Sequence, residues 1–187
     1  MTQTAEEVRI GADAQLYVAP VSTTEPTNVT SSLNAAFSSA LGYISEDGIS
    51  LTDGKTITPI GAMQSFYAVR QLVTGKEFSV AFTLLQTNRD TFETAFGGGT
   101  WTDQGSGKTK YSPPDPSEIL EWCLVADWQD GDISNRLVVP RVSNISPVTM
   151  QLARTSAASL PVTLSLLAPN EGSDPWYVLT DDPAVAS

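Results

Sequence analysis

A strict alternation of side-chain types over residues 76–86 is the feature that most limits how this chain can fold. Every second residue is large and apolar, and those between are small or polar: Phe78, Val80, Phe82 and Leu84 against Glu77, Ser79, Ala81 and Thr83. A period of two is that of a β-strand, whose successive side chains point to opposite faces of its sheet. The pattern predicts a strand with one buried face and one smooth polar face that offers no obvious catalytic group.

The same alternation returns in two later segments, residues 148–154 and 160–168. The second face of the three strands then consists of Glu77, Ser79, Thr83, Thr149, Gln151, Thr163 and Ser165. Such a face is normally the solvated side of an antiparallel sheet. However, exposed faces of monomers usually mix charges, and Lys and Arg are nearly absent here. The face is therefore a candidate functional surface.

The chain as a whole predicts an all-β (β-dominated) fold, a sandwich or barrel of about nine strands with one short α-helix in a connection. We expect that helix at residues 88–96, with Thr87 or Asn88 as its cap and Gly97 as its left-handed stop. Residues 33–40 have the spacing of a second short helix. Further strands are expected at residues 12–18, 41–45, 49–51, 66–74, 118–128, 133–142 and 176–179.

The turns and connections divide the chain into a single domain with extensions. Turns are expected at residues 46–48, 74–76 and 129–132, and a loop or loose hairpin at residues 100–116. We assign residues 1–11 to an N-terminal arm, 12–180 to one domain, and 181–187 to a C-terminal tail.

The connection over residues 52–64 is long and lacks clear periodicity. It nevertheless keeps the apolar residues Ile57, Ile60 and Met63. Long connections without structure of their own are usually functional or disordered. An exposed loop with apolar residues is a candidate contact surface.

Charge limits the possible partners. The chain has 21 acidic and 10 basic residues and a net charge of −11. Because nucleic-acid binding depends on cations that neutralise phosphates, this chain is not expected to hold DNA or RNA tightly. It could still surround a polyanion without binding it, or the acidity could serve solubility alone.

The usual chemical sites are missing from the sequence. There is no histidine, and the single cysteine, Cys123, lies in an apolar run as an inert core thiol. Residues 105–109 resemble a phosphate-binding loop, but Thr102 stands where that motif needs glycine. The pair Glu118 and Glu121 would lie on opposite faces of a strand, and two carboxylates around Gly131 are usually only a turn. We predict no catalytic, cofactor-binding or metal-binding residues.

The N-terminal sequence MTQTAEEVRI lacks the apolar stretch of a secretory signal, and no run of residues is long enough for a transmembrane helix. We expect the chain to be made and kept in a reducing cytosol, with no membrane partner.

Several blocks of the sequence together resemble one protein family. They are LGYISEDGI, FYAVRQLVTGKEFSVAFTLLQTNRDTFETAFGG, VADWQDG, RLVVPRVS and LPVTLSLLAP. In this order they resemble the major tail protein, or tail-tube protein, of long-tailed bacteriophages, most of all those of phages infecting actinobacteria. The resemblance spans residues 11–169 and depends on the combination of strands and turns.

The resemblance implies a structural virion protein, not an enzyme, that needs no cofactor. Its family forms hexameric rings that stack into a hollow tube with a continuous inner β-barrel and a mostly negative lumen, through which DNA passes into the host. The implied partners are further copies of the chain, the tape-measure protein and the tail terminator and distal tail proteins. The implied location is the phage tail, assembled in the bacterial cytoplasm.

Carried onto this sequence, the resemblance makes residues 88–96 the outer helix. It makes the second face of the three alternating strands the wall of the lumen. It makes residues 52–64 the inter-ring loop, with Asp53, Gly54, Lys55, Ile57, Ile60, Met63 and Gln64 as candidate contacts. The terminal segments would be further arms. The alternatives are another virion structural protein, such as a capsid decoration protein, and a carbohydrate-binding or adhesion module.

Overall fold

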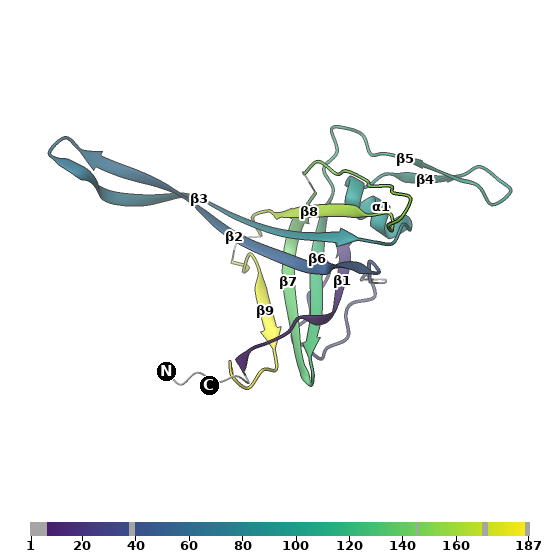
Figure 1. The fold of residues 1–187 in the computed structure, drawn as a ribbon, viewed down its shortest axis with the longest axis horizontal. Helices are drawn as coiled ribbons and strands as arrows, with labels where there is room; N and C mark the ends of the chain where they lie inside the picture. Colours follow the sequence, from purple (N-terminus) through teal and green to yellow (C-terminus); the bar gives the residue numbers. More distant parts are fainter. Residues whose placement is uncertain (1–6, 38–39, 145, 170–171, 186–187) are drawn as a thin grey trace.

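The computed structural model describes residues 7–37, 40–144, 146–169 and 172–185 of the chain. Within these ranges the molecule is built from antiparallel strands and one helix (Figure 1). The elements are β1 (Ala12–Pro20), β2 (Ile44–Ala62), β3 (Ser65–Leu84), α1 (Arg89–Phe96), β4 (Thr100–Asp103), β5 (Thr109–Ser112), β6 (Glu121–Asp130), β7 (Ile133–Ser143), β8 (Leu160–Leu166) and β9 (Tyr177–Thr180). The all-β prediction is confirmed.

The main sheet folds around β7 into two layers. Its strand order is β1-β6-β7-β8-β3-β2, and β9 also pairs with β7. The first half of β7 pairs with β9 at residues 135–138, whereas its last two residues, Val142 and Ser143, pair with β8. As a result, β2, β3 and β8 run across β1, β6 and β7, as in a sandwich of crossed sheets (Figure 1).

The core lies between these two layers and explains the alternation in the sequence. Phe78, Val80, Phe82 and Leu84 of β3 are all buried in it, together with Val162 and Leu164 of β8 and Leu124 and Leu137 of the opposite layer. A smaller cluster on the outer side of β6 and β7 contains Phe37, Cys123, Val125 and Val138, with Leu33, Tyr177 and Leu179 packed against it. The fold therefore buries both faces of the β6–β7 pair.

The helix begins and ends as the sequence indicates. The Asn88 side chain accepts a hydrogen bond from the Thr91 backbone N–H at 2.9 Å, and the Thr91 hydroxyl accepts one from the Asn88 N–H at 2.9 Å. This reciprocal capping box selects Asn88 over Thr87 as the cap. Gly97 follows with φ of 75°, a conformation that costs other residues energy, and the Asn144 amide donates to the carbonyls of Thr94 and Ala95.

Two expected turns are instead irregularities within long strands. The chain passes straight through Thr74 and Gly75 as part of β3, where the pairing register with β2 shifts by one residue. Residues 46–48 likewise lie inside β2, at a register shift where Gly48 has φ of 73°. The predictions of turns at these places are wrong, because a β-bulge uses the same glycine-rich residues as a turn.

The real hairpin turn between β2 and β3 lies at Met63 and Gln64. Residues 52–62, which were expected to be a loop without regular structure, form the outer half of β2. This prediction is also wrong. No face of this half-strand is buried in the described chain. Apolar and polar residues alternate along a strand only when one of its faces is buried, so the sequence of this segment lacks that pattern.

The remaining elements match their predictions in part. β6 and β7 are joined by a tight turn at Gly131 and Asp132, as expected, and residues 100–112 form the small β4–β5 hairpin. Residues 148–154 are not a strand: only Gln151 forms a bridge, with Ser159. Residues 33–37 contain a turn and no helix; the rest of that predicted helix lies partly outside the described residues.

Candidate assembly interface

The longest feature of the molecule is a two-stranded arm that projects from the body (Figure 1). β8 pairs with β3 only between Ser79 and Leu84. β2 and β3 continue outward with no third strand, pairing with each other as far as Ala62 and Ser65. We define the arm as residues 55–76, which begins with the register pair formed by Lys55 and Lys76 and continues outward to the tip. A lone two-stranded ribbon is marginally stable in water, so this arm lacks the support that a sheet normally has.

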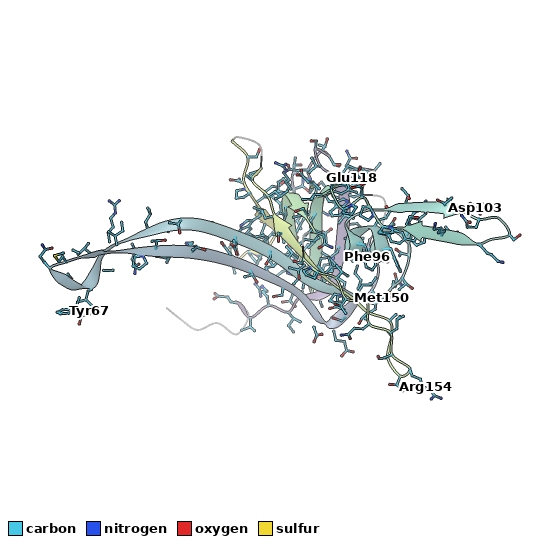
Figure 2. The ribbon with its side chains drawn as sticks, turned by 90° about the horizontal axis from the view of Figure 1, so that it is seen from above. Tyr67, Phe96, Asp103, Glu118, Met150 and Arg154 are labelled. Carbon is cyan, nitrogen blue, oxygen red and sulfur yellow. The ribbon has the colours of Figure 1, made fainter. Side chains whose placement is uncertain are left out.

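Apolar side chains occupy both faces of the arm. Ile57 and Val73 are register partners and share one face, whereas Ile60 and Leu72 lie on the other. Met63 and Phe66 are fully exposed near the tip, close to exposed Tyr67, which Figure 2 labels at the end of the arm. The exposed apolar side chains of the arm are Ile57, Ile60, Met63, Phe66, Tyr67, Val69, Leu72 and Val73. A concentration of this kind marks an interaction surface.

The charge of the arm is opposite to that of the rest of the chain. Lys55, Arg70 and Lys76 are its only charged residues, and the next register pair toward the body adds one acid, Glu77. The remaining residues of the chain carry seven bases against 21 acids, a net charge of −14 beside the +3 of the arm. An apolar, basic arm on an acidic body is electrostatically complementary to another copy of that body.

The predicted polar face is partly assembled by the sheet. Ser79 is the register partner of Ser165, and the neighbouring pair joins Ala81 to Thr163. These side chains and Thr83 lie on the side of the β8–β3–β2 layer opposite the core. Glu77 continues the row toward the arm.

The sheet also adds two residues that the sequence analysis missed. Thr52 pairs with Ser79 and Ser50 pairs with Ala81, so β2 extends the polar face by one strand. Ile49 and Leu51 alternate with Ser50 and Thr52, and this pattern could have placed the two polar residues on the same face. Thr149 and Gln151, by contrast, lie outside the named strands, on the segment that projects near Arg154 in Figure 2. We call the set Ser50, Thr52, Glu77, Ser79, Ala81, Thr83, Thr163 and Ser165 the polar face.

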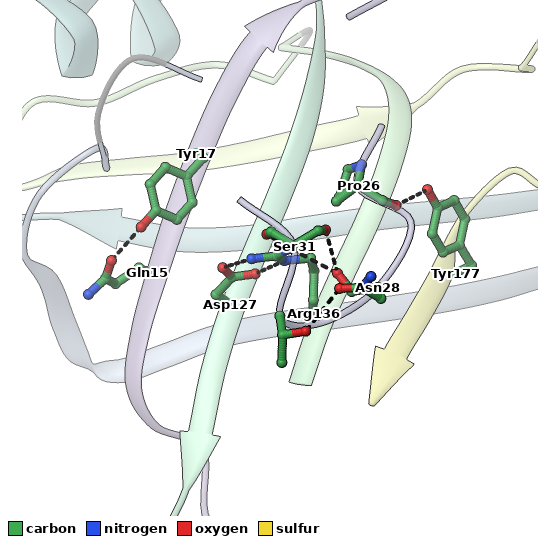
Figure 3. Close-up of polar contacts among 9 residues, drawn as sticks. Gln15, Tyr17, Pro26, Asn28, Ser31, Asp127, Arg136 and Tyr177 are labelled. Atoms are coloured by element: carbon green, nitrogen blue, oxygen red, sulfur yellow. Dashed lines mark hydrogen bonds and ion pairs between the residues drawn. The ribbon is translucent and has the colours of Figure 1, made fainter. Parts of the chain in front are cut away.

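Two acids of β6, Asp127 and Glu121, form ion pairs with arginines of β7. Arg136 is buried and forms a bidentate pair with Asp127 at 2.7 and 2.8 Å (Figure 3). Its third nitrogen donates to the carbonyls of Asn28 at 3.0 Å and Ser31 at 2.8 Å. This contact fixes the segment after β1 over the smaller core cluster. The Asp127 carboxylate raises the pKa of Arg136, although burial acts against it.

A second bidentate pair joins Arg141 and Glu121 at 2.6 and 2.7 Å. Hydrogen bonding to Arg141 lowers the pKa of Glu121. Both pairs arise because the β6–β7 hairpin places residues of its two strands side by side. Glu77 has no ion pair among the described residues, so its charge on the polar face is not compensated.

The segments near the two chain ends are tied together. Arg9 forms a bidentate pair with Asp182, with both nitrogen–oxygen distances 2.7 Å, and the Ile10 N–H donates to the Asp130 carboxylate at 3.2 Å. Hydrogen bonds from Arg9 and from the Ala184 backbone lower the pKa of Asp182. The described parts of the predicted arm 1–11 and tail 181–187 therefore contact one another; the division of the chain into these segments and one domain stays a prediction.

Residues with possible reactivity are used structurally. Burial raises the pKa of the Cys123 thiol to about 12, as expected of an inert core cysteine. Residues 105–108 form the turn of the β4–β5 hairpin and no helix follows, so they lack the setting of a phosphate-binding loop. Across the described ranges, no three acidic or cysteine side chains gather as metal ligands would.

The tryptophans are packed. Trp176 stacks on Phe78 with ring centroids 5.1 Å apart, and Trp101 forms an aromatic cluster with Phe92 and Tyr111 at centroid distances of 4.9 to 5.7 Å. Trp122 and Trp128 pack against the main core. Carbohydrate-binding modules present exposed aromatic rings to sugars, and the tryptophans, which pack against other residues, do not form such a platform.

The fold and its surfaces thus define an all-β structural subunit with a projecting arm. The family model described as phage tail tube protein matches residues 1–187, and the chain belongs to this phage tail tube protein family. It is a structural protein of the virion tail, in agreement with the resemblance noted in the sequence.

Two other comparisons accompany this result. No curated protein sequence matches the chain. One chain of a solved structure titled "Virion of native gene transfer agent (GTA) particle" is similar to it, with 10% sequence identity and a TM-score of 0.42, over 97% of this chain and 100% of that chain. Within the described part of this protein, no helix is long and apolar enough to cross a membrane.

Proposed function

We propose that this protein assembles into hexameric rings that stack into the hollow tail tube, and that DNA passes through its lumen during ejection. The observation that carries the proposal is the polar face next to an unsupported apolar arm. In a single subunit the polar face is only a solvated surface and the arm has no support, whereas a tube would use the first as its wall and the second as a connector.

The composition of the polar face suits the passage of DNA. Its eight residues include no Lys or Arg to bind phosphates and no aromatic ring on which a base could stack. Glu77 adds an uncompensated negative charge, which repels the phosphate backbone. A wall of small hydroxyl side chains therefore lets DNA slide without specific binding.

The edge of the sheet supports a shared inner barrel. β2 is the last strand of its layer and has only β3 as a partner in the described chain. An open edge of this length is an aggregation hazard unless another chain covers it. In a ring of subunits the edge of β2 would pair with the neighbouring subunit, and closure of the barrel would remove the free edges of the β8–β3–β2 layer, whereas β1 would remain an edge strand of the other layer.

In this assembly the arm would bridge successive rings, as proposed for residues 52–64 from the sequence. The structure-based definition of the connector includes both strands, residues 55–76, and leaves out residues 52–54, of which Asp53 and Gly54 pair with Phe78 and Glu77 at its base. Other virion proteins, namely the tape-measure protein inside the tube and the terminator and distal tail proteins at its ends, would contact the same surfaces. Assembly would take place in the cytoplasm of the bacterial host.

Electron microscopy of the concentrated purified protein tests the assembly. We expect tubes or six-fold rings; monodisperse monomers at all concentrations would contradict the proposal. Replacing residues 55–76 with Asn-Gly should leave folded monomers that form no tubes. As a matched control, shortening the β4–β5 turn at residues 104–108 should preserve assembly, because this hairpin is on the opposite side of the body (Figure 1).

Cysteine labelling of assembled tubes tests the lumen assignment. Ser79→Cys should be protected from a large external maleimide but should react after the tubes are dissociated. Glu118→Cys, at an exposed position away from the polar face (Figure 2), should be labelled in both states. Native Cys123 is buried and should not be labelled by the maleimide. Ready labelling of Ser79→Cys in intact tubes would refute the assignment.

A further inference from the structure

The open side of the sandwich contains a groove between the two edge strands β1 and β2. Two adjoining cavities of about 250 and 810 Å³ share Gly11, Ala14 and Gly48 in their walls. The smaller one has an apolar floor made of Ile49, Leu51, Ala126, Trp128 and Leu137. Leu51 is 45% exposed although its register partner, Val80, is fully buried. The core is therefore incompletely covered at this point.

The rim of the groove is acidic. Asp13 and Glu46 line the larger cavity, and neither cavity wall contains a Lys or Arg. Neither carboxylate has an ion pair among the described residues. Asp13 lies at a register shift of β1 with φ of 49°, an unusual backbone conformation that bulges the strand at the rim. The groove thus combines an uncovered apolar floor with uncompensated negative charge.

The tip of the arm has the complementary properties. Met63, Phe66 and Tyr67 supply large exposed apolar side chains. Arg70 lies on the same face as Ile60 and has no ion pair among the described residues. The tip cannot reach the groove of its own chain. Met63 follows Leu51 by twelve positions along β2 and its turn, which corresponds to about 40 Å of extended chain.

We propose that the arm of one copy docks in the β1–β2 groove of a second copy. The apolar tip covers the floor at Leu51 and Trp128, and Arg70 faces Asp13 and Glu46. The partner is another copy because one chain holds both halves of the contact, with charges of +3 on the arm and −14 elsewhere. Since arm and groove are different surfaces, the contact is head-to-tail and repeats from copy to copy. The inference rests on the proposed self-assembly and names the surface that receives the arm.

A charge exchange tests the docking. Arg70→Glu should remain a folded monomer by circular dichroism and should raise the protein concentration needed for tube formation about tenfold or more. Adding Asp13→Lys and Glu46→Lys to the same chain should restore assembly, because the two halves again carry opposite charges. Lys108→Glu makes the same charge change on the β4–β5 hairpin and should alter that concentration less than about twofold.

Disulfide trapping gives an independent readout. A Phe66→Cys/Leu51→Cys variant should form a ladder of cross-linked oligomers in oxidised tubes, since the two sites are too far apart within one chain. Phe66→Cys/Glu118→Cys should not, because Glu118 precedes the opposite end of β6. Tubes without a ladder, or unimpaired assembly of Arg70→Glu, would overturn the docking and leave the tube intact. If the wild-type chain never self-associates, both proposals fall.

Discussion

Lys55 of β2 and Lys76 of β3 lie directly opposite each other at the base of the arm, where their side chains share one face of the ribbon. Lys76 forms an ion pair with Asp53 at 3.2 Å, but Lys55 has no ion pair in the described chain. Like charges at opposed positions weaken strand pairing. The isolated subunit thus holds its arm in an unfavourable arrangement that a negative partner would relieve.

Replacing Lys55 by Glu should therefore have opposite effects on the arm and on the assembly. A new cross-strand attraction to Lys76 should stabilise the pairing of the arm by about 0.2–1 kcal/mol. Hydrogen exchange of arm amides in the monomer should slow accordingly. Tube formation should become weaker, because the arm loses positive charge. Faster exchange in the monomer, or stronger assembly, would contradict this reading; Lys108→Glu is the matched charge change off the arm.

The two arginines of β7 should differ in their contribution to stability, although each binds a β6 carboxylate through two hydrogen bonds. Arg136 is 6% exposed and also anchors the Asn28 and Ser31 carbonyls. Arg136→Met leaves these partners and Asp127 unpaired, and should lower the free energy of unfolding by about 3 kcal/mol. Arg141→Met, at a half-exposed pair, should lower the free energy of unfolding much less than Arg136→Met does, because solvent screens this pair. Urea denaturation of both variants measures the difference; equal losses would refute it.

Acid should weaken the contact between Arg9 and Asp182. The pKa of Asp182 is lowered in the folded state, mainly by the hydrogen bond from Arg9. A carboxyl with a lowered folded pKa stabilises the fold above its unfolded pKa of about 3.9 and loses that effect as pH falls through the folded value. Asp182→Asn should therefore destabilise the protein at pH 6 more than at pH 2.5. The measurement is urea denaturation at the two pH values.

The same experiment has two controls. Arg9→Gln removes the other partner and should show the same dependence on pH. Asp174→Asn changes an exposed acid and should leave the free energy of unfolding almost unchanged at pH 6. If Asp182→Asn behaves like Asp174→Asn, the contact contributes nothing to stability.

The helix cap gives a direct test of local structure. Asn88→Ala removes the hydrogen bond to the Thr91 N–H and should cost about 1 kcal/mol in the free energy of unfolding. Thr87→Ala changes the residue that the sequence left as the other candidate cap and should have an effect within about 0.5 kcal/mol. Thermal denaturation of the two variants distinguishes them. An equal loss for both would show that the cap is not the source of stability.

The elements that could be predicted are those whose sequence pattern lies within a short stretch of neighbouring residues. The buried alternation of β3 and β8, the β6–β7 turn and the helix with its glycine stop each depend on fewer than a dozen neighbouring residues, and all were predicted. The glycine-containing segments at residues 46–48 and 74–76 were misread as turns. Turn and bulge have the same local chemistry, and only the partner strand decides between them.

Part of the candidate site could also be predicted from local alternation. Ser79, Thr83, Thr163 and Ser165 were placed on one surface by alternation alone, whereas Thr149 and Gln151 have that alternation outside any named strand. The β2 half of the arm was recognised as an apolar contact segment but not as a strand, whereas residues 66–74 of its β3 half were predicted as a strand. The period of two arises when one face is buried and the other is not, and neither face of the arm is buried in the single chain.

The sequence by itself determined the local elements, the lack of histidine-based and cysteine-based chemistry, and the strong acidity of a chain that is a poor binder of nucleic acid. Only the tertiary structure decided which distant strands pair, and with them the contact of Arg136 with Asn28 and Ser31, the 22-residue arm and the acidic groove between β1 and β2. Pairing over long sequence separation depends on packing of the whole core, and no window of neighbouring residues contains that information.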